Sequence, residues 1–205
     1  MNRPRPAQGT EPEGTILKRL APTFPLETER LLLRAFVPGD FDALFAIYSR
    51  PDVVRWLYQD TRTEAEVREL LRDKARSRTI DKEGDKLAVA VALKPTLEVV
   101  GDCVLQWTSS RHRQGEIGFV FHPDHHGRGY ATEATAVLLR LAFEELGLHR
   151  VYGRAEPRNT ASARVMEKLG MRREAHLVEN EFVKGEWQGE LIYAILDREW
   201  REAER

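Results

Sequence analysis

The stretch FHPDHHGRGYATEA, from Phe121 to Ala134, decides how the fold of this chain is interpreted. An apolar, strand-like segment, GEIGFVFH, leads into it, and from Gly129 to Leu146 the apolar residues recur with a helical period. A glycine loop between a strand and a helix exposes the free N–H groups of the first helical turn, and the helix dipole adds partial positive charge. The stretch therefore predicts an anion site, and a phosphate suits it.

Two well-known phosphate motifs do not match this loop. A nucleotide-triphosphatase loop needs G-x-x-x-x-G-K-[ST], and a dinucleotide fold needs G-x-G-x-x-G. This chain has only Gly127 and Gly129 on either side of Arg128, without the lysine or the third glycine. Both of these interpretations are therefore weak.

The histidines of the same stretch raise a metal site as an alternative. His122, Asp124, His125 and His126 lie close together in the sequence. Zinc ligands at adjacent positions in a tight turn seldom converge, because successive side chains diverge. No distant ligand is evident either, so we expect no metal here.

Outward from this stretch, strand-like and helical segments alternate. We predict strands over residues 26–36, 86–93, 97–107, 115–122, 150–156, 175–184 and 190–196. We predict helices after the N-cap residues Asp40, Thr63 and Asn159, and over residues 129–146. This order of elements predicts a mixed α/β sheet with the strand–loop–helix unit at its centre.

Length and composition favour one domain. With 205 residues, 41% of them hydrophobic, the chain can build a real core. We expect a flexible tail over residues 1–25, which are rich in Pro, Gly and charge, and a domain over residues 26–201. The net charge of −1 gives no reason to expect a nucleic-acid partner, and no apolar run suggests a membrane. A single cysteine, Cys103, and no apolar signal segment predict a cytoplasmic location.

At the glycine loop the sequence resembles the GNAT superfamily of acetyl-CoA-dependent N-acetyltransferases. The signature of that family, [Q/R]-x-x-G-x-[G/A], reads here as His126 to Ala131, with His in place of Gln or Arg. The resemblance extends through ETERLLLRAF, GEIGFVFHPDHHGRGYATEA and NTASARVMEKLGMRREA, and is closest to the RimJ/RimL-like branch, the ribosomal-protein N-terminal acetyltransferases. It implies a GNAT fold: a mixed, mostly antiparallel sheet of about seven strands, splayed between strands 4 and 5 and flanked by about four helices.

The resemblance also implies where acetyl-CoA, the cosubstrate of the family, would bind. It places the pantetheine arm along Phe119, Val120 and Phe121, although strand packing alone explains the two phenylalanines. The backbone N–H of Val120 is the candidate to polarise the thioester oxygen. The pyrophosphate would lie on the main chain of the loop, which comprises His126, Gly127, Arg128, Gly129, Tyr130, Ala131 and Thr132.

A second segment of the resemblance starts at Asn159. The spacing alone reads this residue as a helix N-cap, whereas the resemblance implies contact with the pantetheine arm or the substrate. Ser162 lies three residues later, where the RimJ/RimL-like branch places a group that protonates the departing thiolate. Many other family members use a tyrosine seven residues after the asparagine, but that position is Met166 here. Arg158 and Arg164 could meet the adenosine phosphates, although solvated arginines are the default.

The amine must lose a proton before it can attack a thioester, and two carboxylates are candidates for the base. Glu116 lies on the predicted 115–122 strand. Glu181 begins EFVKG, which matches the E-[FY]-x-x-G context of the base in the RimJ/RimL-like branch. Either residue could equally be a solvated strand glutamate. We rank Glu181 above Glu116.

The resemblance implies transfer of an acetyl group to a primary amine, by direct attack in a ternary complex. The acceptor would be a protein N-terminus or a small amine. Alternatives are an aminoglycoside or polyamine acetyltransferase, and a non-catalytic CoA-binding or sensing domain. Residues 48–63 are a plausible lid over the acceptor, and pairing of the late strands is compatible with a homodimer.

Overall fold

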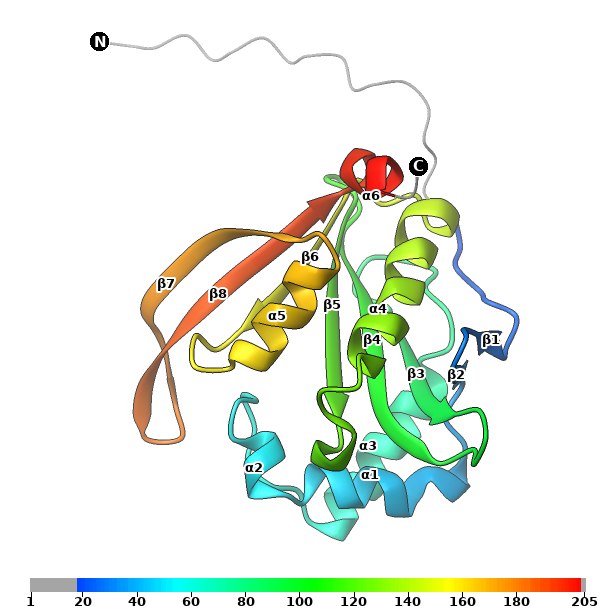
Figure 1. Ribbon diagram of the computed structural model, residues 1–205, viewed down its shortest axis with the longest axis vertical. Coiled ribbons are helices and arrows are strands. Elements are labelled where there is room, and N and C mark those ends of the chain that lie inside the picture. Colours follow the sequence, from blue (N-terminus) through cyan, green and yellow to red (C-terminus); the bar gives the residue numbers. More distant parts are fainter. Residues whose placement is uncertain (1–17, 204–205) are drawn as a thin grey trace, which may run out of the picture.

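One mixed sheet forms the centre of the protein (Figure 1), for which a computed structural model describes residues 18–203. The sheet has eight strands in the order β1-β2-β3-β4-β5-β6-β8-β7 within these residues. All neighbouring strands are antiparallel except β5 and β6, which are parallel. The strands are β1 Leu26–Glu27, β2 Leu31–Arg34, β3 Lys86–Leu93, β4 Val99–Ser109, β5 Gln114–Phe121, β6 Arg150–Ala155, β7 Arg172–Val183 and β8 Glu186–Leu196.

Helices cover both faces of the sheet. α4 and α5 pack on one face around a large apolar core, and α1 and α3 pack on the other around a smaller one (Figure 1). The hairpin of β7 and β8 projects away from these layers (Figure 1). The helices are α1 Phe41–Tyr48, α2 Pro51–Val54, α3 Glu64–Arg76, α4 Tyr130–Arg140, α5 Thr160–Lys168 and α6 Asp197–Ala203, with short 3₁₀ turns at Pro38–Asp40 and Pro123–His125 and a π turn at Leu141–Glu145.

The sequence KLAVAVAL of β3 shows how the two cores are divided. Leu87, Val89 and Val91 belong to the core under α4, whereas Ala88 and Ala90 belong to the core under α1 and α3. Successive side chains of a strand point to opposite faces, so an uninterrupted apolar run fits a strand that is covered on both sides. The small alanines leave room for the aromatic residues of the second core.

The pairing between β5 and β6 is short. Only Gln114, Gly115 and Glu116 of β5 pair with β6, through Arg150, Val151 and Tyr152. The remaining five residues of β5, Ile117 to Phe121, have no partner on that side. The predicted α/β fold and its splay are thereby confirmed, and the splay lies between β5 and β6.

The structure refines three details of the sequence prediction. The expected strand over residues 26–36 is two strands, because the Thr28 N–H donates to the Leu31 carbonyl and turns the chain back. This raises the strand count from the expected seven, and the short α2 and α6 exceed the expected four helices. The tail expected over residues 1–25 lies mostly outside the described residues, but its described end is ordered, since Leu20 is fully buried and pairs with Ile80.

Two of the three expected N-caps, Thr63 and Asp40, behave differently. Thr63 caps α3 in a capping box with Glu66, as predicted. Asp40 precedes α1 but does not cap it, because its carboxylate is held by Arg34 at 2.7 and 2.8 Å and by the Val37 N–H at 2.9 Å. A charged, bidentate partner outweighs the single bond that a cap would provide.

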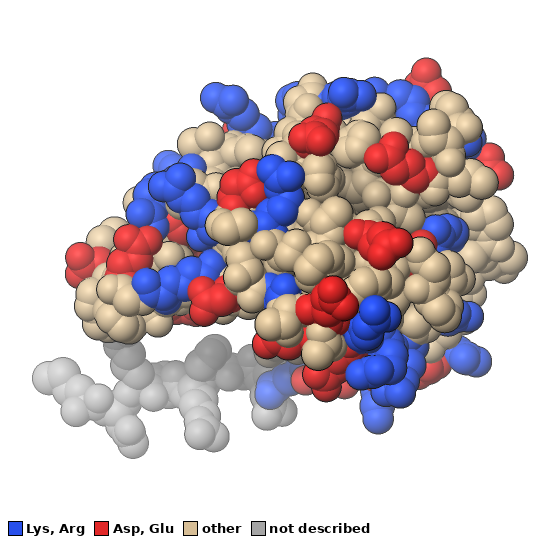
Figure 2. Space-filling model, turned by 90° about the horizontal axis from the view of Figure 1, so that it is seen from below, with Lys and Arg blue, Asp and Glu red and all other residues tan. Residues whose placement is uncertain are grey.

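Charges of both signs are interspersed over the lower face of the molecule, as Figure 2 shows. Among residues 18–203, no helix has the length and apolar composition needed to cross a membrane.

A buried ion pair fixes the α1–α3 layer to the sheet. The Lys74 ammonium of α3 lies 2.6 Å from Oδ1 of Asp102 on β4, and the Tyr48 hydroxyl of α1 donates to Oδ2 at 2.8 Å. The side chains of Lys74 and Asp102 are only 9% and 2% exposed. Burial, together with the charge of Asp102, raises the pKa of Tyr48, so the hydroxyl stays a donor.

Replacing Asp102 by alanine is expected to lower the free energy of unfolding by about 3–5 kcal/mol, because it leaves the Lys74 ammonium buried without its counter-charge. The double change Lys74→Met with Asp102→Leu should recover most of that loss, since no charge is then buried. Urea unfolding measures both. A loss below about 1 kcal/mol for Asp102→Ala would mean that water reaches the pair in solution.

Candidate active site

The loop between β5 and α4 presents unpaired backbone donors. Gly127 and Gly129 have φ angles of +74° and +81°, which residues with a side chain adopt only with strain. Gly129 is the N-cap of α4, and the helical hydrogen bonds begin with the Glu133 N–H, which donates to the Gly129 carbonyl at 3.0 Å. The N–H groups of residues 130–132 therefore have no partner within the helix, and they suit a phosphate at this helix end.

Glu133 ties this loop to the start of the sheet. Its carboxylate accepts from the Thr28 hydroxyl at 2.5 Å, the Arg30 N–H at 3.0 Å and the Arg30 guanidinium at 2.7 Å. Arg30 also donates to the Arg128 carbonyl at 2.9 Å and stacks 4.9 Å over the Tyr130 ring. Partial burial acts to raise the pKa of Glu133, but these bonds outweigh it and hold that pKa below its ordinary value. The loop is thus preorganised by two segments that the sequence analysis compared separately, ETERL and ATEA.

The backbone of β5 shows which groups face the splay. The His122 N–H donates to the Val100 carbonyl of β4 at 2.9 Å, and a Cβ at Gly153 of β6 would lie 3.5 Å from the Ile117 carbonyl oxygen. Because N–H and C=O groups alternate sides along a strand, those of Phe119 and Phe121 face the gap, whereas those of Val120 face β4. The expectation that the Val120 N–H polarises a thioester was therefore wrong in its register, and Phe119 and Phe121 carry the available donors.

His126 joins the glycine loop to this open edge. Its Nε2 lies 2.9 Å from the Phe121 carbonyl oxygen, a contact that requires the proton on Nε2. The carbonyl faces the gap, where no strand partner can satisfy it. His126 therefore satisfies the carbonyl at the end of β5 and positions the start of the loop.

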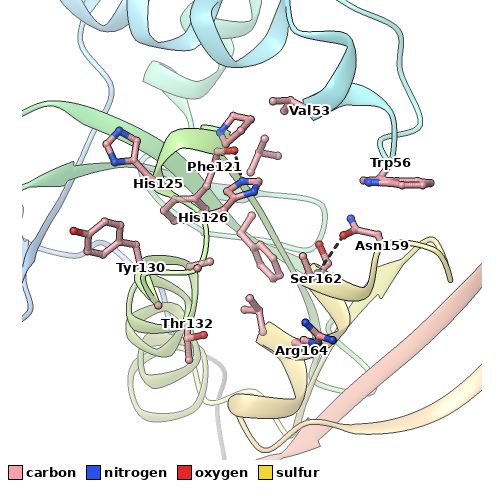
Figure 3. Close-up of a pocket in the computed structure, with 18 of the residues that line it drawn as sticks. Val53, Trp56, Phe121, His125, His126, Tyr130, Thr132, Asn159, Ser162 and Arg164 are labelled. Atoms are coloured by element: carbon pink, nitrogen blue, oxygen red, sulfur yellow. Dashed lines mark hydrogen bonds between the residues drawn. The ribbon is translucent and has the colours of Figure 1, made fainter.

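A cleft of about 500 Å³ runs along the splay. Figure 3 shows Phe121, His126 and Thr132 on one side of it and Asn159, Ser162 and Arg164 on the other. Of the predicted cofactor residues, all but Arg128 line the cleft; Arg128 contributes its carbonyl to Arg30 instead. The lining comprises Asp52, Val53, Trp56, Leu57, Phe119, Val120, Phe121, Pro123, His125, His126, Gly127, Gly129, Tyr130, Ala131, Thr132, Asn159, Ala161, Ser162, Arg164, Val165 and Lys168.

The start of α5 forms the wall opposite the loop. The Asn159 side chain accepts from the Ser162 N–H at 3.2 Å, so it is the N-cap that its spacing predicted. This bond uses the backbone N–H of Ser162, which itself lines the cleft. Met166 is 1% exposed and packs over Gly153, where an added Cβ would lie 2.8 Å from its sulfur. Met166 is thus a core residue and has no proton to give.

The sequence analysis missed part of the cleft wall. Trp56 lies in the segment expected to be a lid, and it lines the cleft together with Asp52, Val53 and Leu57. Its ring lies between the Arg55 and Arg158 guanidiniums, at 4.4 and 5.4 Å. The proximity to α5 that places Trp56 here follows from tertiary packing and leaves no signal in a single sequence.

The two candidate bases lie outside this lining, on the sheet face that carries α1 and α3. Glu116 accepts from Arg154 Nε at 2.8 Å and from the Tyr152 hydroxyl at 3.3 Å. Glu181 is half-buried and, within residues 18–203, accepts no hydrogen bond and forms no ion pair. A guanidinium therefore occupies the Glu116 carboxylate but not the Glu181 carboxylate.

A buried carboxylate that the sequence analysis did not single out connects these candidates. Glu190 of β8 is 5% exposed, and its Oε1 accepts from the Tyr58 hydroxyl at 2.6 Å and from Arg154 Nη1 at 3.2 Å. Burial and the bond to Glu190 raise the pKa of Tyr58, and the nearby charge of Glu181 adds to this rise. Two carboxylates, Glu116 and Glu190, thus hold the Arg154 guanidinium, and the charge of Glu181 lies near Tyr58 in the expected lid.

The histidines contact three different partners. The His122 Nδ1 accepts from the Asp124 N–H at 3.3 Å, the His125 Nε2 lies 3.4 Å from a Glu98 oxygen, and His126 binds the Phe121 carbonyl. In the described part of the chain, no group of three or more His, Cys, Asp or Glu side chains is arranged to hold a metal ion.

The comparison with protein families decides what this arrangement is. A family model described as an acetyltransferase (GNAT) domain matches residues 30–172, which include the glycine loop, the splayed strands and α5. The chain belongs to the GNAT acetyltransferase family. It is an N-acetyltransferase, and the donor that this family uses is acetyl-CoA.

Several known proteins are similar to this GNAT acetyltransferase. The uncharacterised N-acetyltransferase YnaD of Bacillus subtilis (strain 168) is 33% identical over 175 residues, which cover 85% of this chain and 98% of YnaD. A GNAT-family acetyltransferase from Bacillus anthracis is also 33% identical, and its crystal structure has a TM-score of 0.77 over 85% of this chain and 99% of that chain. The spermidine N(1)-acetyltransferase of Vibrio cholerae serotype O1 is 25% identical over 164 residues, covering 78% of this chain and 88% of that protein.

The contact between His126 and Phe121 predicts a difference between two substitutions. His126→Ala should raise the KM for acetyl-CoA about fivefold, because one hydrogen bond of about 1 kcal/mol no longer positions the loop. His126→Gln should stay within about twofold of the wild type, since a glutamine amide can donate to the same carbonyl. Steady-state kinetics measure both, and a glutamine variant as weak as the alanine variant would contradict this role.

Proposed function

We propose that this N-acetyltransferase binds acetyl-CoA in the cleft along β5 and transfers the acetyl group to a small cationic primary amine. The observation that carries the proposal is the pairing of β5 with β6 over only three residues, which leaves backbone donors and acceptors facing the cleft. An extended, amide-containing arm can bind to such an open strand edge as an added strand would. The cleft also has the shape and polar groups for the other end of the cosubstrate, because the unpaired N–H groups at the start of α4 suit a pyrophosphate.

In this proposal, different parts of the cleft bind different parts of acetyl-CoA. The main chain of Phe119 and Phe121 holds the pantetheine arm, and the glycine loop from Gly127 to Thr132 holds the pyrophosphate. Acetyl-CoA supplies an activated thioester carbonyl. A backbone N–H of the β5 edge, from Phe119 or Phe121, polarises that carbonyl oxygen. Holding the amine and the thioester together contributes several kcal/mol toward the barrier, since it removes the entropy cost of a bimolecular encounter.

Proton movements are assigned to two side chains. Glu181 accepts a proton from the ammonium, which makes the amine nucleophilic, and we rank it above Glu116 because Arg154 does not occupy it. The amine nitrogen then forms a bond to the carbonyl carbon, the bond between carbon and sulfur breaks, and the second proton that the nitrogen must lose passes to the departing thiolate or to solvent. The Ser162 hydroxyl donates to the departing thiolate, which needs little help because it is already a fair leaving group.

The acceptor class follows from the sheet face that carries Glu116, Glu181 and Glu190. Arg154 pairs with Glu116 and Glu190 but not with Glu181, so these side chains carry more negative than positive charge. Such a face favours an amine that arrives as a cation, and it disfavours an acceptor that bears its own carboxylate. The similarity to a spermidine acetyltransferase supports the same class. A ribosomal-protein N-terminus, which the RimJ/RimL-like pattern suggested, and an aminoglycoside are the other acceptors to be tested.

The proposal is tested by thiol release from acetyl-CoA with diamines, monoamines of the same chain length, peptide N-termini, amino acids and aminoglycosides. We expect diamines to have the highest kcat/KM. Preference for a peptide N-terminus or an amino acid would overturn the acceptor class. Failure to bind CoA in calorimetry would overturn the site itself.

Glu181→Gln is expected to lower kcat about 100-fold, the usual contribution of a positioned general base, while the KM for acetyl-CoA changes less than about twofold. The exposed Glu179 on the same strand offers a matched control, and Glu179→Gln should leave both constants unchanged. Rates are measured between about pH 6 and pH 9. Unchanged turnover of Glu181→Gln across this range would exclude Glu181 as the base.

A further inference from the structure

Two basic side chains at the mouth of the cleft have no role in the chemistry described above. Arg164 and Lys168 lie on α5, line the cleft and are exposed. Residues four apart on a helix share one face, so their charged groups can meet at one point. Neither side chain forms a hydrogen bond, an ion pair or a ring contact within residues 18–203.

Most other arginines near the cleft are already occupied, which makes this pair unusual. Arg30 is held by Glu133, Arg154 by Glu116 and Glu190, and Arg158 by Glu156 and Glu186 at 2.6 Å each. Asp52, the acidic residue that lines the cleft, pairs with Arg50 at 2.9 Å. Among the residues described, the charge left unpaired on the cleft wall is therefore positive and lies on α5.

The pair stands opposite the phosphate-binding end of α4. Figure 3 shows Arg164 and Thr132 on opposite sides of the cleft, Arg164 from α5 and Thr132 from the first turn of α4. A ligand whose pyrophosphate lies on the N–H groups of residues 130–132 would therefore pass between the two walls. A further phosphate on that ligand would meet the cations of α5.

We propose that Arg164 and Lys168 bind the 3′-phosphate of coenzyme A and make the enzyme selective for donors that carry this group. This inference rests on the proposed acetyl-CoA site and adds its donor specificity. Acetyl-CoA binds with three phosphates, the first two on the loop and the third on α5. Donors that lack the 3′-phosphate, such as acetyl-dephospho-CoA or a phosphopantetheine arm on a carrier protein, lose the contact with α5.

The test measures kcat and KM with acetyl-CoA and with acetyl-3′-dephospho-CoA as matched donors. For the wild type, we expect the KM for the dephospho donor to be about 10- to 100-fold higher than the KM for acetyl-CoA, at similar kcat. This factor corresponds to the loss of charge-assisted hydrogen bonds that contribute about 1.5–3 kcal/mol. Arg164→Gln with Lys168→Gln should raise the KM for acetyl-CoA by a similar factor and leave the KM for the dephospho donor unchanged. Arg164→Lys with Lys168→Arg, which keeps both charges, should retain most of the discrimination.

Arg140→Gln is the control for a general loss of positive charge, because Arg140 lies in the last turn of α4 and pairs with Glu145. It should change neither KM. Equal KM values for the two donors with the wild type would overturn the inference while leaving the acetyl-CoA site intact, and so would an equal loss for both donors in the double variant. No turnover and no binding of either donor would instead overturn the proposed function.

Discussion

The structure depends on the early end of the pairing between β5 and β6. Parallel strands joined by a helix would normally pair along their length, but here only three residues of β5 do so. The unpaired edge would be costly if it were buried without partners. It lies instead on an open cleft, where His126 satisfies one carbonyl and a ligand can satisfy the rest. The gap also joins the two faces of the sheet, so a donor and an acceptor can approach each other from opposite sides.

The two sides of the gap are held by different forces. On the donor side, the glycine loop is fixed by Glu133, Arg30 and Thr28, all within ordinary hydrogen-bond distance. On the proposed acceptor side, α2 and the residues after it are fixed by polar contacts, from the Tyr58 hydroxyl to Glu190 of β8 and from Lys184, in the turn between β7 and β8, to the Val54 carbonyl. A rigid donor site fits a cosubstrate that the whole family shares, whereas a polar and partly exposed acceptor site is free to differ between members.

Local chemistry explains what could be predicted from the sequence. The Thr63 capping box and the Asn159 cap depend on neighbours a few residues away, and these predictions were confirmed. The failures came from long-range contacts. The Asp40 carboxylate binds Arg34 instead of capping α1. The orientation of the Val120 N–H depends on the register between β5 and β4. Glu190 binds Tyr58, which lies 132 residues away in the sequence. A single sequence does not show which residues far apart along the chain will contact each other in the fold.

Amide hydrogen exchange along β5, with and without acetyl-CoA, tests the central claim most directly. The account predicts that acetyl-CoA slows exchange at Phe119 and Phe121 and at residues 130–132, while Val120, whose N–H faces β4, is slow in both states. Exchange at Phe119 and Phe121 that stays the same when acetyl-CoA binds would contradict the account, and so would protection that appears at Val120 instead.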